Sequence, residues 1–75
     1  MPVTSVVIEV QDGVSEDILG RLALLSNVNV YGMKENQIVT VIEGESAVEV
    51  DDTVRTIQSL VGVVGVYPVY SGEYE

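Results

Sequence analysis

The chain contains no cysteine, histidine, tryptophan or phenylalanine. Without cysteine it has no disulfide and no thiolate metal site. Without histidine it has no imidazole to act as a catalytic base or nucleophile or to ligate a metal. These absences exclude the commonest kinds of catalytic and metal-binding centres, and we expect no cofactor and no metal.

Basic residues are scarce as well. Only 3 of the 75 residues are Lys or Arg, against 12 Asp and Glu, which gives a formal net charge of −9. Nucleic acids and anionic membrane surfaces are bound through basic patches, so the balance argues against both as partners. It favours a cationic partner, although a negative charge also serves solubility alone.

Long apolar runs are missing too. The longest, at 61–66, contains two glycines and is far too short to span a bilayer. The first five residues lack the basic region that opens a secretory signal. We therefore expect a cytoplasmic protein that forms a single domain over residues 1–75, with a short acidic tail at 71–75.

Valine is abundant, and its spacing alternates between strand and helix patterns. β-branched segments bounded by turn residues predict strands at 3–10, 28–33, 37–43 and 63–70. A first helix is predicted after Ser15, which we expect as its N-cap, and it should extend to Leu25. A second is predicted at 47–60, with Gly62 as the residue that follows it.

The resulting order is βαββαβ, which predicts an α+β fold of the ferredoxin-like type. Such a fold has a four-stranded antiparallel sheet with two helices on one face. The helices leave the second face of the sheet bare, so that face must meet water or a partner.

Catalytic groups are not visible in this framework. The acidic pairs at 16–17 and 51–52 lie on predicted helices, where adjacent side chains diverge and do not converge on one site. No glycine-rich phosphate loop precedes a helix. The loop at 11–14 has no arginine to hold a phosphate, as an acylphosphatase-like hydrolase would need. We therefore predict a binding protein and not an enzyme.

Alternation along the strands suggests which side chains face away from the helices. Val6, Ile8, Val10, Val64 and Val66 are expected to face inward. The third strand stays ambiguous, because its two faces are equally apolar. The candidate binding residues on the bare face are Val7, Tyr31, Met33, Tyr67 and Val69, rimmed by Glu9, Glu35 and Glu43. An exposed apolar surface of this kind usually marks an interaction site.

Two other uses of the sheet remain open. The bare face can be buried in a homodimer by sheet-on-sheet packing. Pro68 cannot donate a ladder hydrogen bond, which suggests that the last strand lies at an edge. An unpaired edge can accept a strand from a partner.

The chain resembles the NapD family, the chaperones of periplasmic nitrate reductase. The resemblance covers nearly the whole chain and rests on hydrophobic patterns rather than on catalytic signatures. They are SVVIEV at 5–10, VNVY at 28–31, QIVTVIE at 37–43 and IQSLVGVVGVYPVY at 57–70, followed by an acidic tail.

The resemblance implies a ferredoxin-like fold and a cytoplasmic chaperone. Such a chaperone binds the twin-arginine signal peptide of the nitrate reductase catalytic subunit and delays export until the molybdenum cofactor is inserted. The peptide is basic and then apolar, which suits an apolar face with an acidic rim. An alternative also comes from resemblance: the amino-acid-binding regulatory domains of the ACT and Lrp/AsnC type share this topology.

Overall fold

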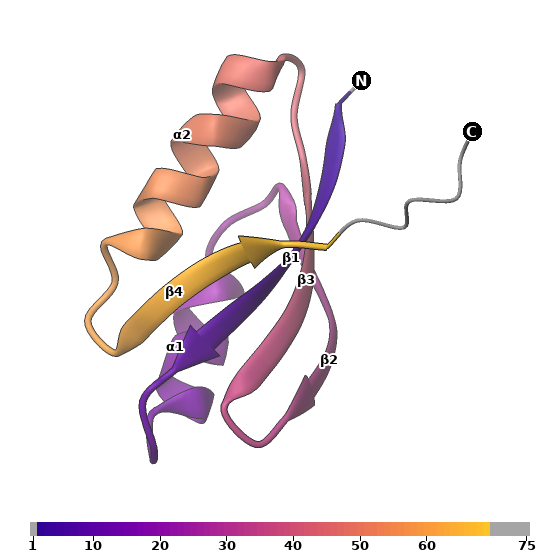
Figure 1. Ribbon diagram of the computed structural model, residues 1–75. Coiled ribbons are helices and arrows are strands. Elements are labelled where there is room, and N and C mark those ends of the chain that lie inside the picture. Colours follow the sequence, from indigo (N-terminus) through magenta and orange to yellow (C-terminus); the bar gives the residue numbers. More distant parts are fainter. Residues whose placement is uncertain (1, 70–75) are drawn as a thin grey trace.

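The computed structural model describes residues 2–69. The elements in this part of the chain are β1 (Val3–Val10), α1 (Ser15–Leu22), β2 (Val28–Lys34), β3 (Gln37–Glu43), α2 (Ala47–Gln58) and β4 (Val63–Pro68). Their order confirms the predicted βαββαβ arrangement (Figure 1). The predicted end of the last strand at Tyr70 and the acidic tail at 71–75 lie outside the described residues.

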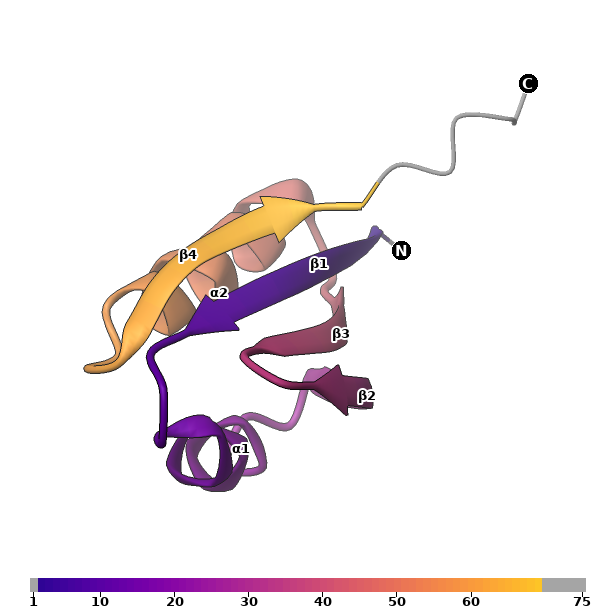
Figure 2. The same ribbon diagram turned by 60° about the horizontal axis from the view of Figure 1, so that its bottom comes forward.

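The strands lie side by side in the order β2-β3-β1-β4, and every neighbouring pair is antiparallel. Each helix therefore connects two parallel strands that have a third strand between them (Figure 2). This split βαβ connection is the ferredoxin-like topology that the sequence predicts. β2 and β4 are the edges of the sheet, so Pro68 lies on an edge strand as expected.

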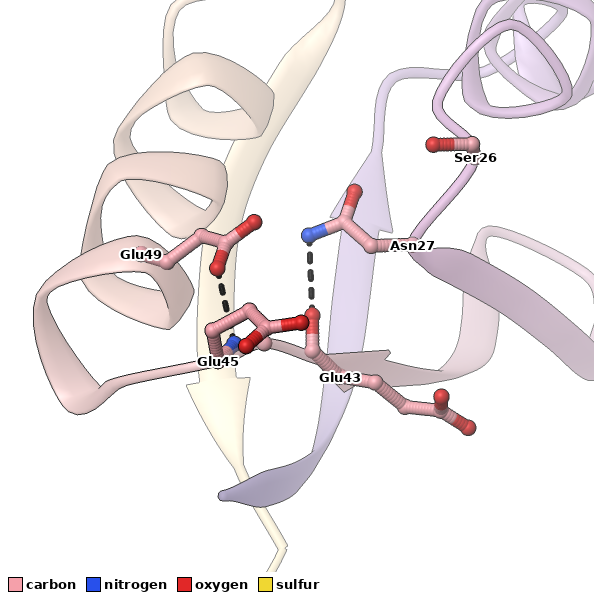
Figure 3. A pocket seen from close by; sticks show the side chains of 6 residues that line it. Ser26, Asn27, Glu43, Glu45 and Glu49 are labelled. Atoms are coloured by element: carbon pink, nitrogen blue, oxygen red, sulfur yellow. Dashed lines mark hydrogen bonds between the residues drawn. The ribbon is translucent and has the colours of Figure 1, made fainter. Parts of the chain in front are cut away.

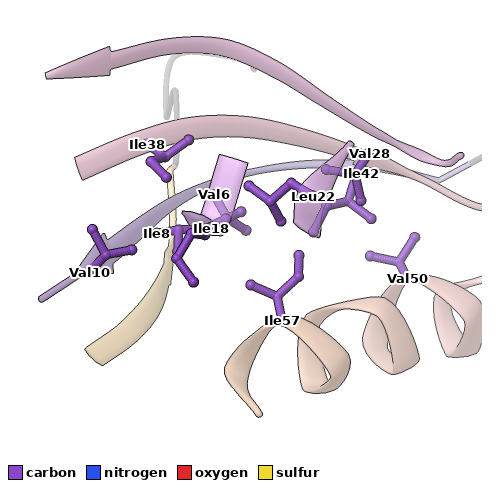
Figure 4. Packing of buried hydrophobic residues seen from close by; sticks show 10 residues of the cluster. All are labelled: Val6, Ile8, Val10, Ile18, Leu22, Val28, Ile38, Ile42, Val50 and Ile57. Carbon is purple, nitrogen blue, oxygen red and sulfur yellow. The ribbon is translucent and has the colours of Figure 1, made fainter. Parts of the chain in front are cut away.

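The core lies between one face of the sheet and the helices (Figure 4). On β1, the residues predicted to face inward, Val6, Ile8 and Val10, are at most 2% exposed. On β3, Ile38 and Ile42 are fully buried, which settles the ambiguous phase of that strand. The rest of the core comes from both helices and β2: Ile18, Leu22, Val28, Val50 and Ile57. Since both helices join one core, they cover the same face of the sheet.

The two ends of α1 differ from the sequence prediction. Val14 occupies the N-cap position without a side-chain hydrogen bond, so the prediction of Ser15 as the cap is wrong. The Ser15 hydroxyl instead donates to the backbone oxygen of Glu35 at 3.2 Å. The helix ends at Leu22 because a tight turn follows, in which the N–H of Leu25 donates to the oxygen of Leu22 at 3.0 Å. Leu25 still packs against the core.

α2 has a side-chain cap. The hydroxyl of Ser46 accepts the N–H of Glu49 at 3.2 Å, and the Glu49 carboxylate accepts the N–H of Glu45 at 2.7 Å. The first bond satisfies a donor that the first turn of a helix leaves free, and the second fixes the residue that precedes the N-cap. The helix ends at Gln58, so Gly62 is not the residue directly after it, and that prediction is wrong. Gly62 instead forms the turn into β4 with a φ of 101°, which glycine adopts without strain.

Candidate functional site

A row of apolar and aromatic side chains crosses the open face, the face of the sheet opposite the helices. Tyr67 of β4 pairs with Val7 of β1, and Val7 pairs with Val39 of β3. Val39 pairs in turn with Gly32 of β2, beside Tyr31. Paired residues of antiparallel strands project to the same face. We call Tyr31, Val39, Val7 and Tyr67 the central row.

The central row is accessible and continues along the sheet. Tyr31 is 72% exposed and Tyr67 is 51% exposed. Toward the start of β1 the apolar surface extends over Val3 and Val69, which are 60% and 46% exposed. Val69 is held there because its N–H donates to the oxygen of Ser5 at 2.9 Å. The structure thus brings together four predicted site residues: Val7, Tyr31, Tyr67 and Val69.

Met33 does not join them. The pairing of β2 with β3 skips one residue at Tyr31, so β2 has a bulge there. Beyond the bulge the alternation is reversed, and Met33 pairs with the core residue Ile38 on the helix-covered side. The prediction of Met33 on the open face is therefore wrong. A strict alternation cannot anticipate an extra residue in a strand.

β4 contains a second irregularity of the same kind. Gly65 pairs with Glu9 and Val63 pairs with Val10, which leaves Val64 without a partner. Val64 is 57% exposed, whereas Val63 packs against the core. The prediction that Val64 faces inward is wrong for the same reason, because the extra residue shifts the alternation.

The three predicted rim carboxylates lie at two ends of the open face. Glu9 pairs with Gln37 at the end where β3 begins, and Glu35 lies in the β2–β3 turn at that same end. Glu43 lies at the other end of β3. Glu43 lies six positions beyond Gln37 on β3, so the two ends are about 20 Å apart. The carboxylates therefore flank the apolar surface and do not form one cluster.

The carboxylates of the open face are uncompensated. Both ion pairs within residues 2–69 lie on the helices: Arg21 with Asp17 at 3.4 Å and Arg55 with Asp52 at 3.9 Å. Lys34 shares a row with Gln37 and Glu9, two strand spacings or about 10 Å from Glu9. Lys34 was not among the predicted site residues.

A polar hollow adjoins the Glu43 end of the open face (Figure 3). Its lining consists of Ser26, Asn27, Glu43, Gly44, Glu45 and Glu49. The Asn27 amide donates to the backbone oxygen of Glu43 and to the hydroxyl of Thr53, both at 2.9 Å. Asn27 therefore connects the start of β2 to the end of β3 and to α2. We interpret this hollow as a structural junction.

The predicted site did not include several residues of the open face, among them Val39, Val41 and Gly65. β3 is apolar on both faces, so its sequence carried no signal for the two valines. Gly65 did carry a signal, because an aromatic side chain on the same face often covers a glycine of an edge strand. Tyr67 follows Gly65 by two positions on such a strand.

Within residues 2–69, no three Asp or Glu side chains are grouped so that they could hold a metal ion. Neither helix of that stretch is long and apolar enough to cross a membrane.

A split βαβ sheet with helices on one face and an exposed apolar second face defines a small binding domain of the ferredoxin-like class. The family model of the NapD protein matches residues 1–73, and the chain therefore belongs to the NapD family. A solved structure described as the solution structure of the E. coli Tat proofreading chaperone protein NapD matches with a TM-score of 0.85. That match has 24% sequence identity and covers 99% of this chain and 80% of the other. No curated protein matches the chain.

Family membership confirms the resemblance drawn from the sequence, and with it the prediction of a chaperone rather than an enzyme. The structural match confirms the ferredoxin-like fold. A peptide-binding role for Val7, Glu9, Tyr31, Met33, Glu35, Glu43, Tyr67 and Val69 stays a prediction.

Proposed function

We propose that the chain is a cytoplasmic chaperone for the catalytic subunit of a periplasmic nitrate reductase. It binds the twin-arginine signal peptide of that subunit and delays export until the cofactor has been inserted. The observation that supports this most is the open face: an apolar central row lies between carboxylates that take part in no ion pair within residues 2–69.

The chemistry of the peptide matches this surface. A twin-arginine signal peptide has a basic segment followed by an apolar one. The apolar segment would contact the central row and Val69, and the arginines would meet carboxylates at an end of the sheet. The net charge of −9 attracts a cationic peptide over a longer range and speeds its association.

Calorimetric titration tests this function. At low salt we expect measurable binding of a twin-arginine peptide, weaker binding of a twin-lysine version and no binding of a di-alanine version. The absence of binding by the twin-arginine peptide, or equal binding of all three, would contradict the proposal.

The binding face can be tested by a matched pair of substitutions. Val39→Asp places a charge in the central row and should abolish peptide binding. Val48→Asp makes the same change on α2, at a position that is 68% exposed, and should leave binding intact. If both variants bind like the parent chain, the peptide does not use the open face.

The amino-acid-sensor alternative is not retained, because the chain belongs to the NapD family. A homodimer through the open face would compete with the peptide for the same side chains. Sedimentation with and without peptide distinguishes the two: a dimer that persists when the peptide is bound would place the peptide elsewhere.

A further inference from the structure

The ring of Tyr67 lies over Gly65, two positions earlier on β4. A Cβ atom at Gly65 would be 2.7 Å from Cζ and 3.0 Å from Cε2 of Tyr67, and nearer still to the hydroxyl oxygen. Both residues project to the open face because they are two apart on one strand. The ring occupies space that any side chain at position 65 would take. It therefore extends back along the strand and forms a preformed aromatic surface.

A carboxylate lies directly beside this ring. Glu9 is the β1 partner of Gly65, so its Cβ lies about 5 Å from the position that the ring covers. Glu9 is half-buried, and within residues 2–69 it forms no ion pair. An aromatic ring and an uncompensated carboxylate thus meet at one corner of the open face.

We propose that Tyr67 and Glu9 form a guanidinium-binding site that reads an arginine of the bound peptide, an inference that rests on the proposed function. The planar guanidinium stacks on the ring and directs its N–H groups sideways to the carboxylate. A lysine ammonium has no plane to stack, so it interacts less with the ring and depends mainly on the carboxylate. This site places the basic segment at the Glu9 end, with the apolar segment over Val7, Val39 and Val69.

Tyr31 and Glu43, which also lie on the open face, do not form a second site of this kind. Tyr31 lies on the opposite edge strand, three strand spacings or about 14 Å from Tyr67. Lys34 lies on the same face of β2, two residues beyond Gly32, and repels a cation there. Glu43 pairs with Val3, which offers no ring. These residues supply matched controls.

The first test replaces each tyrosine by leucine and measures the affinity ratio between twin-arginine and twin-lysine peptides by calorimetry. Tyr67→Leu should weaken the arginine peptide about fivefold and the lysine peptide at most about twofold, so that the preference falls. Tyr31→Leu removes a similar apolar contact and should weaken both peptides equally. An unchanged arginine preference in Tyr67→Leu would overturn the inference.

The second test leaves the tyrosine in place and moves its ring. Gly65→Ala should displace the ring and reduce the arginine preference. Gly32→Ala makes the same change on the same face, where an added Cβ meets no atom of residues 2–69 within 4 Å, and should preserve the preference. If circular dichroism shows that Gly65→Ala does not fold, the Tyr67→Leu variant of the first test still decides whether the ring reads arginine, because Tyr67 is exposed.

The third test concerns the carboxylate. Glu9→Gln should weaken binding of the arginine peptide about threefold at low salt. In the Glu9→Gln background, adding Tyr67→Leu should weaken binding much less than it does in the parent chain, because the two side chains act on the same guanidinium. Glu43→Gln should show no such coupling to Tyr67. If the parent chain prefers arginine and none of the three variants changes that preference, the inference fails and the proposed function stands. If the parent chain binds no peptide, both fail.

Discussion

The two faces of the sheet are built from the same kind of residue but have opposite surroundings. On β3, the neighbours Ile38 and Val39 are 0% and 42% exposed. On β1, Ile8 is buried in the core while Val7 belongs to the central row. The helices cover one face only, so apolar side chains on the other remain available to a partner. Apolar character by itself therefore does not distinguish core from binding surface here.

The largest expected difference between the faces is in stability. Ile38→Ala should lower the free energy of unfolding by about 3 kcal/mol, because it leaves a cavity in the core. Val39→Ala, one residue along the same strand, should cost less than about 1 kcal/mol. Urea denaturation of the two variants measures both values. Similar losses would mean that the open face is buried in solution, as in a homodimer.

The junction beside the open face should be the next most sensitive region. Asn27→Ala removes two hydrogen bonds that join β2, β3 and α2, and should cost about 2 kcal/mol. Asn29→Ala changes an exposed residue of β2, two positions further along the chain, and should cost less than about 0.5 kcal/mol. Thermal unfolding followed by circular dichroism compares them. Equal midpoints would show that the junction contributes nothing to stability.

Replacing one core residue of the covered face should increase stability. Thr40 is fully buried, and its hydroxyl has no hydrogen-bond partner among residues 2–69. Thr40→Val keeps the shape and removes the unsatisfied group, so stability should rise by about 1 kcal/mol. Thr53→Val should have the opposite sign, because the Thr53 hydroxyl bonds both Asn27 and Glu49. A loss of stability in Thr40→Val would indicate an unrecognised partner for that hydroxyl.

The smallest expected effect is the response to salt, and it should differ in sign between folding and binding. Raising the ionic strength from 10 to 150 mM screens the repulsion within a chain of net charge −9 and should add about 0.5 kcal/mol of stability. The same change should weaken a basic peptide on the open face. Denaturation and calorimetry in matched buffers test this, and a binding affinity that does not depend on salt would contradict the electrostatic part of the proposal.

Local patterns predicted most of the framework but not its irregularities. The inward residues of β1, Val6, Ile8 and Val10, followed from spacing alone. The predictions for Met33 and Val64 failed because each lies at or beyond a bulge that the alternation does not reveal. The prediction of Ser15 as the N-cap was wrong because its hydroxyl donates to the backbone oxygen of Glu35, 20 residues further along the chain.

By itself, the sequence determined the order of the elements, the absence of His- and Cys-based chemistry, the negative charge and the family resemblance, because each of these depends on residue identity and local spacing. Only the tertiary structure decided which face of β3 is covered, where the strands bulge and how Tyr67, Gly65 and Glu9 meet. Those features depend on strand register, which is set by pairing between segments far apart in the chain.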